Sequence, residues 1–231
     1  MRLSPDELIF WQWDFIKINA TLVFSWLVML LLIVLSWLTT RSLSSGITMT
    51  RGQNVLEAIV TFLQGQIEEV SQQNAEPYLA FIGTLFLYIT AANVLTVVPG
   101  FEPPTGSLSS TAALAVCVFI AVPFFGISRK GLKAYLRQYV QPNVIMLPFN
   151  LIGELSRTLS LAVRLFGNIM SGTVIVAILL AIAPLFLPVV MQAFGLLIGL
   201  IQAYIFAILA VVFIASATAP DKTKTTEFTD A

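Results

Sequence analysis

The stretch MLPFNLIGELSRTLSLAVRLFGNIMSGTVIVAILLAIA, residues 146–183, decides the fold class of this chain. It is almost continuously apolar and far longer than the roughly 20 residues that a helix needs to cross a bilayer. At about 1.5 Å per residue, one helix over this stretch would extend roughly 55 Å, against about 30 Å of hydrocarbon. Residues 189–217 form a second apolar stretch after Pro184 and Pro188. We therefore predict that 144–183 and 189–217 form a long, steeply tilted helical hairpin in a membrane.

Three shorter apolar runs precede this hairpin, at residues 20–38, 80–98 and 108–127. Each has the length of one membrane span. Residues 52–73 differ, because Leu56, Ile59, Leu63 and Ile67 recur at helical spacing and the acidic residues fall on the other side. This pattern predicts an amphipathic interfacial helix. The chain is therefore expected to be an all-α multi-pass membrane protein with about five spans, forming a single membrane domain over residues 1–231.

The composition excludes several classes of function. Hydrophobic residues make up 58% of the chain and charged residues only 10%, whereas charged residues make up about 25% of an ordinary soluble domain. The net charge is zero, so no nucleic-acid partner is expected. The chain has no histidine and no GxxxxGK[ST] phosphate-binding loop. We expect no catalytic residues, no cofactor and no metal site, and therefore no enzyme activity by this chain alone.

The basic residues outside the spans are distributed unevenly. With five crossings, eight of them fall on one side and only Arg2 and Lys17 on the other. Because basic residues concentrate on the cytoplasmic side, the N-terminal segment 1–19 is predicted outside and the tail 218–231 in the cytoplasm. The eight residues are Arg41, Arg51, Arg129, Lys130, Lys133, Arg137, Lys222 and Lys224.

The remaining two arginines lie inside the long apolar stretch and belong to a polar stripe. At about 100° per residue, five polar residues of this stretch fall within about 40° of one line along the helix, with Glu154 at its edge. These five are Arg157, Ser160, Arg164, Asn168 and Ser171.

Arg164 has no acidic partner within reach in its own sequence neighbourhood. An arginine stays protonated, and placing it in the middle of a membrane costs about 2.5–3.5 kcal/mol on insertion scales. Glu154 is three residues from Arg157 and can support it, but it lies about 15 Å along the helix from Arg164. No other acid occurs between Asn143 and Ala219. Either a second subunit supplies the carboxylate, or Arg164 reaches a lipid headgroup or backbone carbonyls.

Other candidates lie in the neighbouring spans. Gln202, in the run LIQAYIF, carries an amide that needs a hydrogen bond and could line a wet path. Gly195 and Gly199 form a GxxxG pattern that favours close helix packing. Asn93 lies late in the 80–98 span, where a capping or helix-contact role competes with a place on an ion path.

The stretches LAVRLFGNIMSG around Arg164 and LIQAYIF around Gln202 resemble the two signature segments of subunit a of F-type ATP synthases. Two further segments, PYLAFIGTLFLYITAANVLTVVPG and PPTGSLSSTAALAV, look like the family's outer-loop region. The resemblance covers residues 19–218 and is nearest the chloroplast and cyanobacterial branch.

This resemblance implies a stator that holds an essential arginine, here Arg164, against the carboxylates of a rotating c-subunit ring. Two offset half-channels would couple the flow of H⁺ or Na⁺ to rotation, and ATP chemistry would lie on other subunits of the F1Fo complex. Peripheral-stalk subunits of the b type are further expected partners.

The resemblance also assigns individual positions. Asn168, Gln202 and Asn93 match polar positions of the ion path, which we extend to the neighbouring Ser171 and Thr173, while Glu154 and Arg157 match a supporting acid and base. Two positions depart from the usual pattern, because Thr173 and Gly195 stand where many relatives carry a titratable side chain. The usual protonatable relay is therefore absent, which leaves the choice between H⁺ and Na⁺ open.

Two other classes of function compete with this interpretation. One is a secondary ion transporter or channel that works alone, since buried charges on a bent helix also serve substrate binding. The other is a purely structural membrane subunit, in which Arg164 would tolerate replacement. The expected location is the plasma membrane of a bacterium, with the thylakoid membrane as the second possibility.

Overall fold

The computed structural model describes residues 9–13, 16–41, 51–140, 146–183 and 186–219. Five helices in this part of the chain are long and apolar enough to cross a membrane. They are α1 (Ala20–Thr40), α3 (Glu76–Val94), α4 (Leu108–Lys130), α6 (Met146–Ile182) and α7 (Leu187–Thr218). The predicted class, a helical multi-pass membrane protein, is confirmed.

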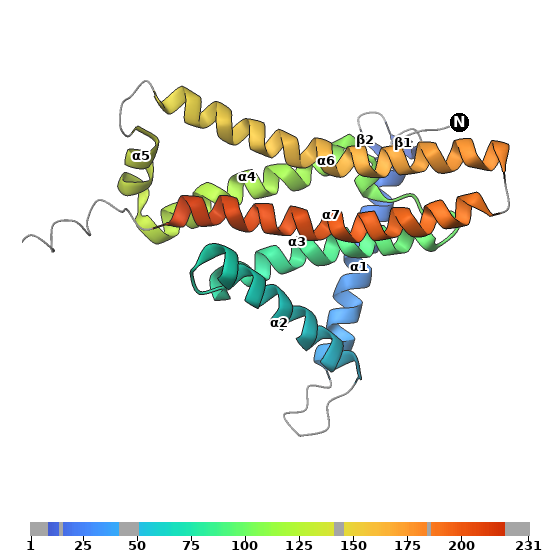
Figure 1. Ribbon diagram of the computed structural model, residues 1–231, viewed down its shortest axis with the longest axis horizontal. Coiled ribbons are helices and arrows are strands. Elements are labelled where there is room, and N and C mark those ends of the chain that lie inside the picture. Colours follow the sequence, from blue (N-terminus) through green and yellow to red (C-terminus); the bar gives the residue numbers. More distant parts are fainter. Residues whose placement is uncertain (1–8, 14–15, 42–50, 141–145, 184–185, 220–231) are drawn as a thin grey trace, which may run out of the picture.

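Four of these helices run lengthwise beside one another (Figure 1). Helices α6 and α7 form a long hairpin, α3 packs against α7, and α4 packs against both α6 and α7. Small and β-branched residues make up most of the core between them, with Ala203, Ala207 and Ala210 of α7 and Ala115 of α4 fully or almost fully buried beside larger side chains such as Phe206. Small side chains let helices approach closely in a membrane, where dispersion contacts rather than water exclusion hold them together.

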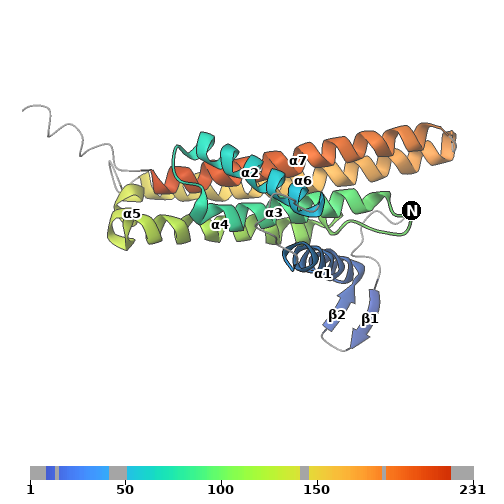
Figure 2. The ribbon, with the colours of Figure 1, turned by 90° about the horizontal axis from the view of Figure 1, so that it is seen from below.

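Helix α1 runs across the direction of the other four long helices, as Figures 1 and 2 both show. In Figure 2 it is seen almost end on, while α6 and α7 lie in the plane of the picture. If α1 crosses the bilayer steeply, the α6–α7 hairpin must cross it at a low angle. This geometry explains how a 37-residue helix fits about 30 Å of hydrocarbon.

Helix α2 (Arg51–Ser71) occupies the region predicted as an amphipathic helix. Its apolar residues Leu63 and Ile67 are buried, whereas Glu57, Glu68 and Glu69 are exposed. The helix rests on α3 and α7. Across the contact with α7, the Tyr204 hydroxyl donates a hydrogen bond to Oε1 of Gln66.

Two elements of the structure were not anticipated. Strands β1 (Ile9–Trp13) and β2 (Ile16–Asn19) form an antiparallel hairpin, where the sequence suggested only an outer N-terminal segment. Helix α5 (Leu132–Val140) follows α4 directly, and only Gly131, with φ of +82°, separates the two. Glycine adopts this conformation without the steric cost that a side chain would impose.

The turn between α3 and α4 lies at the opposite end of the bundle from α5 (Figure 1). Helix α3 ends in a 3-10 turn, η2 (Leu95–Val97), and the chain then passes Gly100, whose φ is +86°. A second 3-10 turn, η3 (Pro104–Gly106), leads into α4 and contacts both α4 and α6. Helix α3 begins at Glu76, earlier than the predicted residue 80, because Pro77 is well suited to the first turn of a helix.

Candidate functional site

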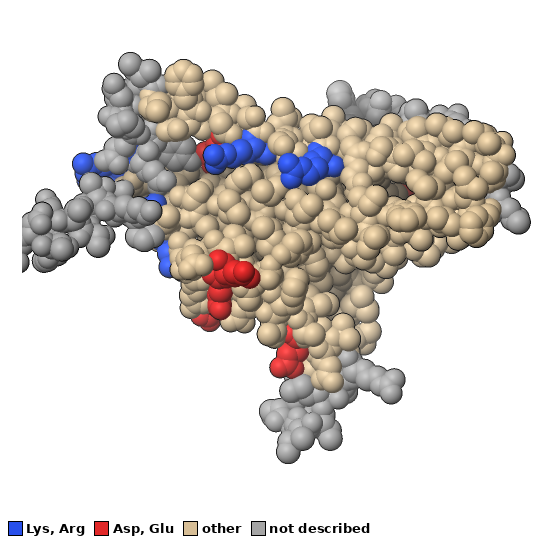
Figure 3. All heavy atoms as spheres, viewed as in Figure 1, with Lys and Arg blue, Asp and Glu red and all other residues tan. Residues whose placement is uncertain are grey.

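The polar stripe predicted on the long helix lies along α6. Arg157, Ser160, Arg164 and Ser171 are exposed, and Asn168 is half-buried. Figure 3 shows basic patches along the part of the surface that α6 forms, with an acidic patch beside one of them and uncharged residues around the other. The neighbouring residues Leu159 and Val163 are also exposed, at 63% and 51%. Arg164 therefore lies on a surface whose apolar character suits lipid or another membrane helix rather than water.

A shallow cavity of about 300 Å³ adjoins Arg164 between α6 and α7. Serine hydroxyls of α6 and apolar side chains of α7 line it, together with both arginines. Within the described residues, no acid forms an ion pair with Arg164. The guanidinium thus lacks a counter-ion from this part of the chain. The lining residues are Ser156, Arg157, Ser160, Leu161, Arg164, Leu209 and Phe213.

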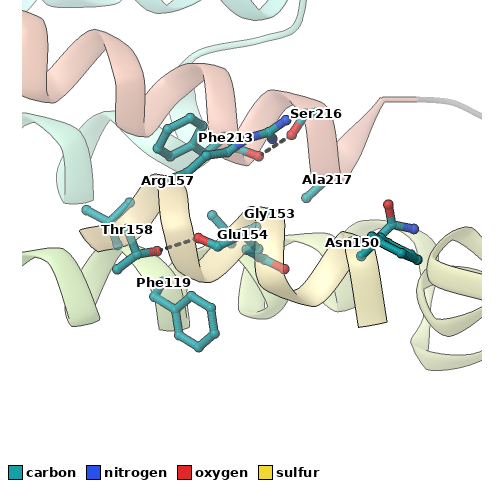
Figure 4. Close-up of a pocket in the computed structure, with 12 residues that line it drawn as sticks. Phe119, Asn150, Gly153, Glu154, Arg157, Thr158, Phe213, Ser216 and Ala217 are labelled. Carbon is teal, nitrogen blue, oxygen red and sulfur yellow. Dashed lines mark hydrogen bonds between the residues drawn. The ribbon is translucent and has the colours of Figure 1, made fainter. Parts of the chain in front are cut away.

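Glu154 and Arg157 line a second, larger cavity of about 510 Å³ between α4, α6 and α7 (Figure 4). The Arg157 side chain extends from α6 towards α7, where its guanidinium lies 5.8 Å from the centre of the Phe213 ring. The Glu154 backbone carbonyl accepts a hydrogen bond from the Thr158 hydroxyl at 3.0 Å. The structure therefore places the predicted supporting pair in one cavity and gives Arg157 an aromatic neighbour.

Asn93 and Gly199 meet in the buried contact between α3 and α7. The Asn93 side-chain amide donates a hydrogen bond of 2.7 Å to the Gly199 carbonyl. A Cβ atom at position 199 would lie 2.9 Å from Cγ of Asn93, which is closer than real Cβ contacts. Gly199 therefore makes the close packing that the GxxxG pattern predicted, and the partner is Asn93.

Three polar atoms are buried on this side of the bundle without a hydrogen-bond partner among the described residues. They are Oγ1 of Thr90, Oδ1 of Asn93 and Nε2 of Gln202. Thr90 precedes Asn93 by one helical turn, and Gln202 follows Gly199 by three residues. An unpaired buried polar atom costs about 1–3 kcal/mol, so such atoms are normally paired with protein or water. The two helices thus present donors and acceptors that water or an ion could use.

Gly195 differs from Gly199, because a Cβ atom there would meet nothing within 4 Å. The close packing predicted at Gly195 is therefore not made within the described chain. Ser171 and Thr173 are exposed, and each hydroxyl donates a hydrogen bond to a backbone carbonyl one turn earlier on α6. Ser171 donates to Asn168, and Thr173 donates to Met170. These hydroxyl groups lie on α6 outside the core.

The structure adds two polar features that the sequence did not single out. The buried Thr90 hydroxyl could have been found from the spacing of three residues between Thr90 and Asn93. Gln192 Nε2 donates a hydrogen bond of 3.0 Å to the Thr96 carbonyl, which joins α7 to the turn η2 and had no sequence signal. Among the described residues, no group of three or more His, Cys, Asp or Glu could hold a metal ion.

Comparison with known proteins gives one consistent family. The family model described as ATP synthase A chain matches residues 22–215. The ATP synthase subunit a 2 of Acaryochloris marina, a cyanobacterial relative, is 61% identical over 222 residues, covering 96% of this chain and 95% of the relative. The ATP synthase subunit a of Albidiferax ferrireducens is 62% identical over 97% of both chains. The subunit a 1 of Chlorobaculum parvum is 62% identical over 94% of this chain and 96% of its own. The chain therefore belongs to the ATP synthase subunit a family.

Proposed function

We propose that this chain is the stator of a rotary ATP synthase and that it holds Arg164 against the carboxylates of a c-subunit ring. As a member of the subunit a family it is a non-catalytic membrane subunit, and the ATP chemistry takes place on other subunits. The geometry of the site supports the roles that we give to Arg164 and to the residues of the ion path.

The proposal is supported above all by the exposed position of Arg164 on an apolar membrane helix. No acid of the described part of the chain forms an ion pair with it. A permanent cation in this position needs a counter-charge, because its desolvation is costly. A ring carboxylate passing this face would supply that charge, and the arginine would displace the coupling ion from it. Arg164 would also separate the two half-channels and so prevent a short circuit.

The two half-channels are assigned to the two polar regions of the bundle. Asn93, Gln202 and the neighbouring Thr90 form the outer route, since their unpaired polar atoms can bind water between α3 and α7. The cavity lined by Glu154 and Arg157 forms the inner route, because its lining includes Phe149 and Asn150 at the start of α6, which lies at the α5 end of the bundle (Figure 1). Asn168, Ser171 and Thr173 continue the polar surface of α6 beyond Arg164.

The coupling ion is H⁺ or Na⁺, and the chain itself offers no titratable relay at Thr173 or Gly195. Na⁺ needs only oxygen ligands and water, and a proton can move along a chain of water molecules. Neither ion therefore requires a titratable side chain at these two positions. The ATP hydrolysis rate of the assembled complex, titrated with NaCl at constant ionic strength, separates the two. Saturable activation by Na⁺ identifies sodium coupling, and a rate that is insensitive to Na⁺ identifies proton coupling.

The assembly and its placement complete the proposal. Partners are the c-subunit ring, peripheral-stalk subunits of the b type and the rest of the F1Fo complex, in a lipid bilayer. The chain forms one membrane domain in the plasma membrane of a bacterium, with its N-terminus outside and its C-terminus in the cytoplasm.

Replacement of Arg164 tests the proposal. In assembled complexes, both Arg164→Ala and Arg164→Lys are expected to abolish ATP-driven ion pumping while the subunit composition stays normal. Lysine fails because a compact ammonium does not reproduce the planar guanidinium. Normal pumping in either variant would show that Arg164 is not needed for ion transport and that the chain has only a structural role. Ion flux through vesicles that contain this chain alone would instead identify a transporter or channel that works by itself.

A further inference from the structure

We propose that α5 and the adjoining end of α4 form a binding surface for anionic phospholipid headgroups. The surface consists of Leu132, Lys133, Leu136 and Arg137 of α5 together with Arg129 of α4. It lies at the end of the bundle opposite the α3–α4 turn, where α4 leaves the apolar part of the molecule (Figure 1). The inference concerns the placement of the chain in lipid and stands independently of the proposed ion path.

Helix α5 packs against α4 and α6, and an aromatic side chain anchors it to α4. Tyr135 is only 6% exposed and occupies the space above Gly126 of α4. A Cβ atom at position 126 would lie 2.6 Å from Cε2 of Tyr135, so only glycine leaves room for the ring. Because Gly131 turns the chain between α4 and α5, the short helix is held against the end of its predecessor.

The outward side of α5 carries an apolar stripe beside a basic one. Leu132 and Leu136 are four residues apart and 57% and 54% exposed. Lys133 and Arg137, also four residues apart, are exposed on the adjacent side. Residues four apart lie on the same helix face. A helix with exposed leucines next to exposed cations suits the boundary between acyl chains and headgroups.

The charge of this surface is uncompensated by its own segment. Residues 108–140 contain no acid, and within the described residues neither Lys133 nor Arg137 forms an ion pair. The Arg129 guanidinium is placed 5.6 Å from the centre of the Tyr78 ring on α3. Tyr78 is itself buried, so this contact anchors Arg129 at the end of the bundle. Basic residues near a membrane surface attract anionic lipid, at about 1 kcal/mol for each charge.

The experiment measures which lipids the purified full chain retains. Wild-type chain is reconstituted in equal amounts of phosphatidylglycerol and phosphatidylcholine, extracted in mild detergent and examined by native mass spectrometry. The double variant K133Q/R137Q is compared with the charge-preserving K133R/R137K and with R41Q, which removes an exposed cation at the end of α1. Circular dichroism of each variant checks that the helix content is unchanged.

We expect the preference for phosphatidylglycerol over phosphatidylcholine to fall about 25-fold in K133Q/R137Q, because each of the two removed charges contributes about fivefold. The preference should persist in both controls, and added salt should weaken it in the wild type, because salt screens exposed charges. An unchanged preference in K133Q/R137Q would overturn the proposal. So would loss of a protein subunit from the assembled complex with lipid retention unchanged, because the surface would then bind protein. Ion pumping is not part of this readout, so failure of the proposed function would leave the result unaffected.

Discussion

The Asn93 side-chain amide donates a hydrogen bond of 2.7 Å to the carbonyl of Gly199, a residue 106 positions further along the chain. This contact joins α3 to α7 in the buried part of the bundle, and Asn93 is only 1% exposed. Because the Nδ2 atom is used in this bond, the Oδ1 atom is left as an acceptor without a partner among the described residues. The missing side chain of Gly199 thus fixes the orientation of a polar group that we propose as part of the ion path.

Gly199→Ala is expected to impair both stability and ion transport. The new methyl group would lie 2.9 Å from Cγ of Asn93, so the two helices must separate or the amide must turn. Overpacking of this kind typically costs about 1–3 kcal/mol. Thermal unfolding of the purified complex and its ATP-driven pumping rate measure the two effects. Gly195→Ala is the matched control on the same helix, since a Cβ atom there meets nothing within 4 Å. Equal behaviour of the two variants would contradict the role given to Gly199.

Gln202→Leu should separate stability from function. The Nε2 atom of Gln202 is buried without a partner among the described residues, so leucine removes an unsatisfied donor at similar volume. The unfolding temperature should stay the same or rise, with a gain of up to about 1–3 kcal/mol. Pumping should fall, because the proposed outer route loses a group that can bind water. A variant that pumps at the wild-type rate would show that Gln202 is only a packing residue.

Arg157→Leu is predicted to be much milder than Arg164→Leu. Arg157 faces the Phe213 ring at 5.8 Å, and this interaction contributes about 0.5–1 kcal/mol at an exposed site. Loss of this interaction in Arg157→Leu should lower stability slightly, and the variant should keep part of its coupled ion transport. Pumping assays on both variants, normalised to the amount of assembled complex, test the difference. Complete loss of pumping in Arg157→Leu would give the two arginines equal importance.

Gln66→Leu is expected to loosen α2 from α7. The Gln66 amide oxygen accepts the hydrogen bond of the Tyr204 hydroxyl, and its loss leaves a half-buried hydroxyl unpaired at a cost of about 1–3 kcal/mol. Faster hydrogen exchange of the α2 amides would report this change. Gln64→Leu serves as the control, because the exposed Gln64 donates a hydrogen bond to Glu68 within the same helix. Similar exchange in both variants would mean that the hydrogen bond to Tyr204 does not hold α2.

Much of the fold could be predicted because the membrane imposes a simple rule on sequence. Long apolar runs must be helices in hydrocarbon, so the regions that became α1, α3, α4, α6 and α7 were recognisable from composition and length. The N-terminal β-hairpin and α5 were missed. Both are short elements beside the spans, where the apolar-run signal does not apply.

The sequence by itself determined that α6 carries a permanent charge, Arg164, with no acid in its neighbourhood, because charge and spacing are properties of one segment. Only the tertiary structure decided that Asn93 meets Gly199, that Gly195 remains open and that α1 crosses the direction of the hairpin. The physical reason is that lipid is as apolar as a helix core, so hydrophobic periodicity does not mark the face that packs. That face is chosen by small residues and polar atoms of helices far apart in the chain, which come together only on folding.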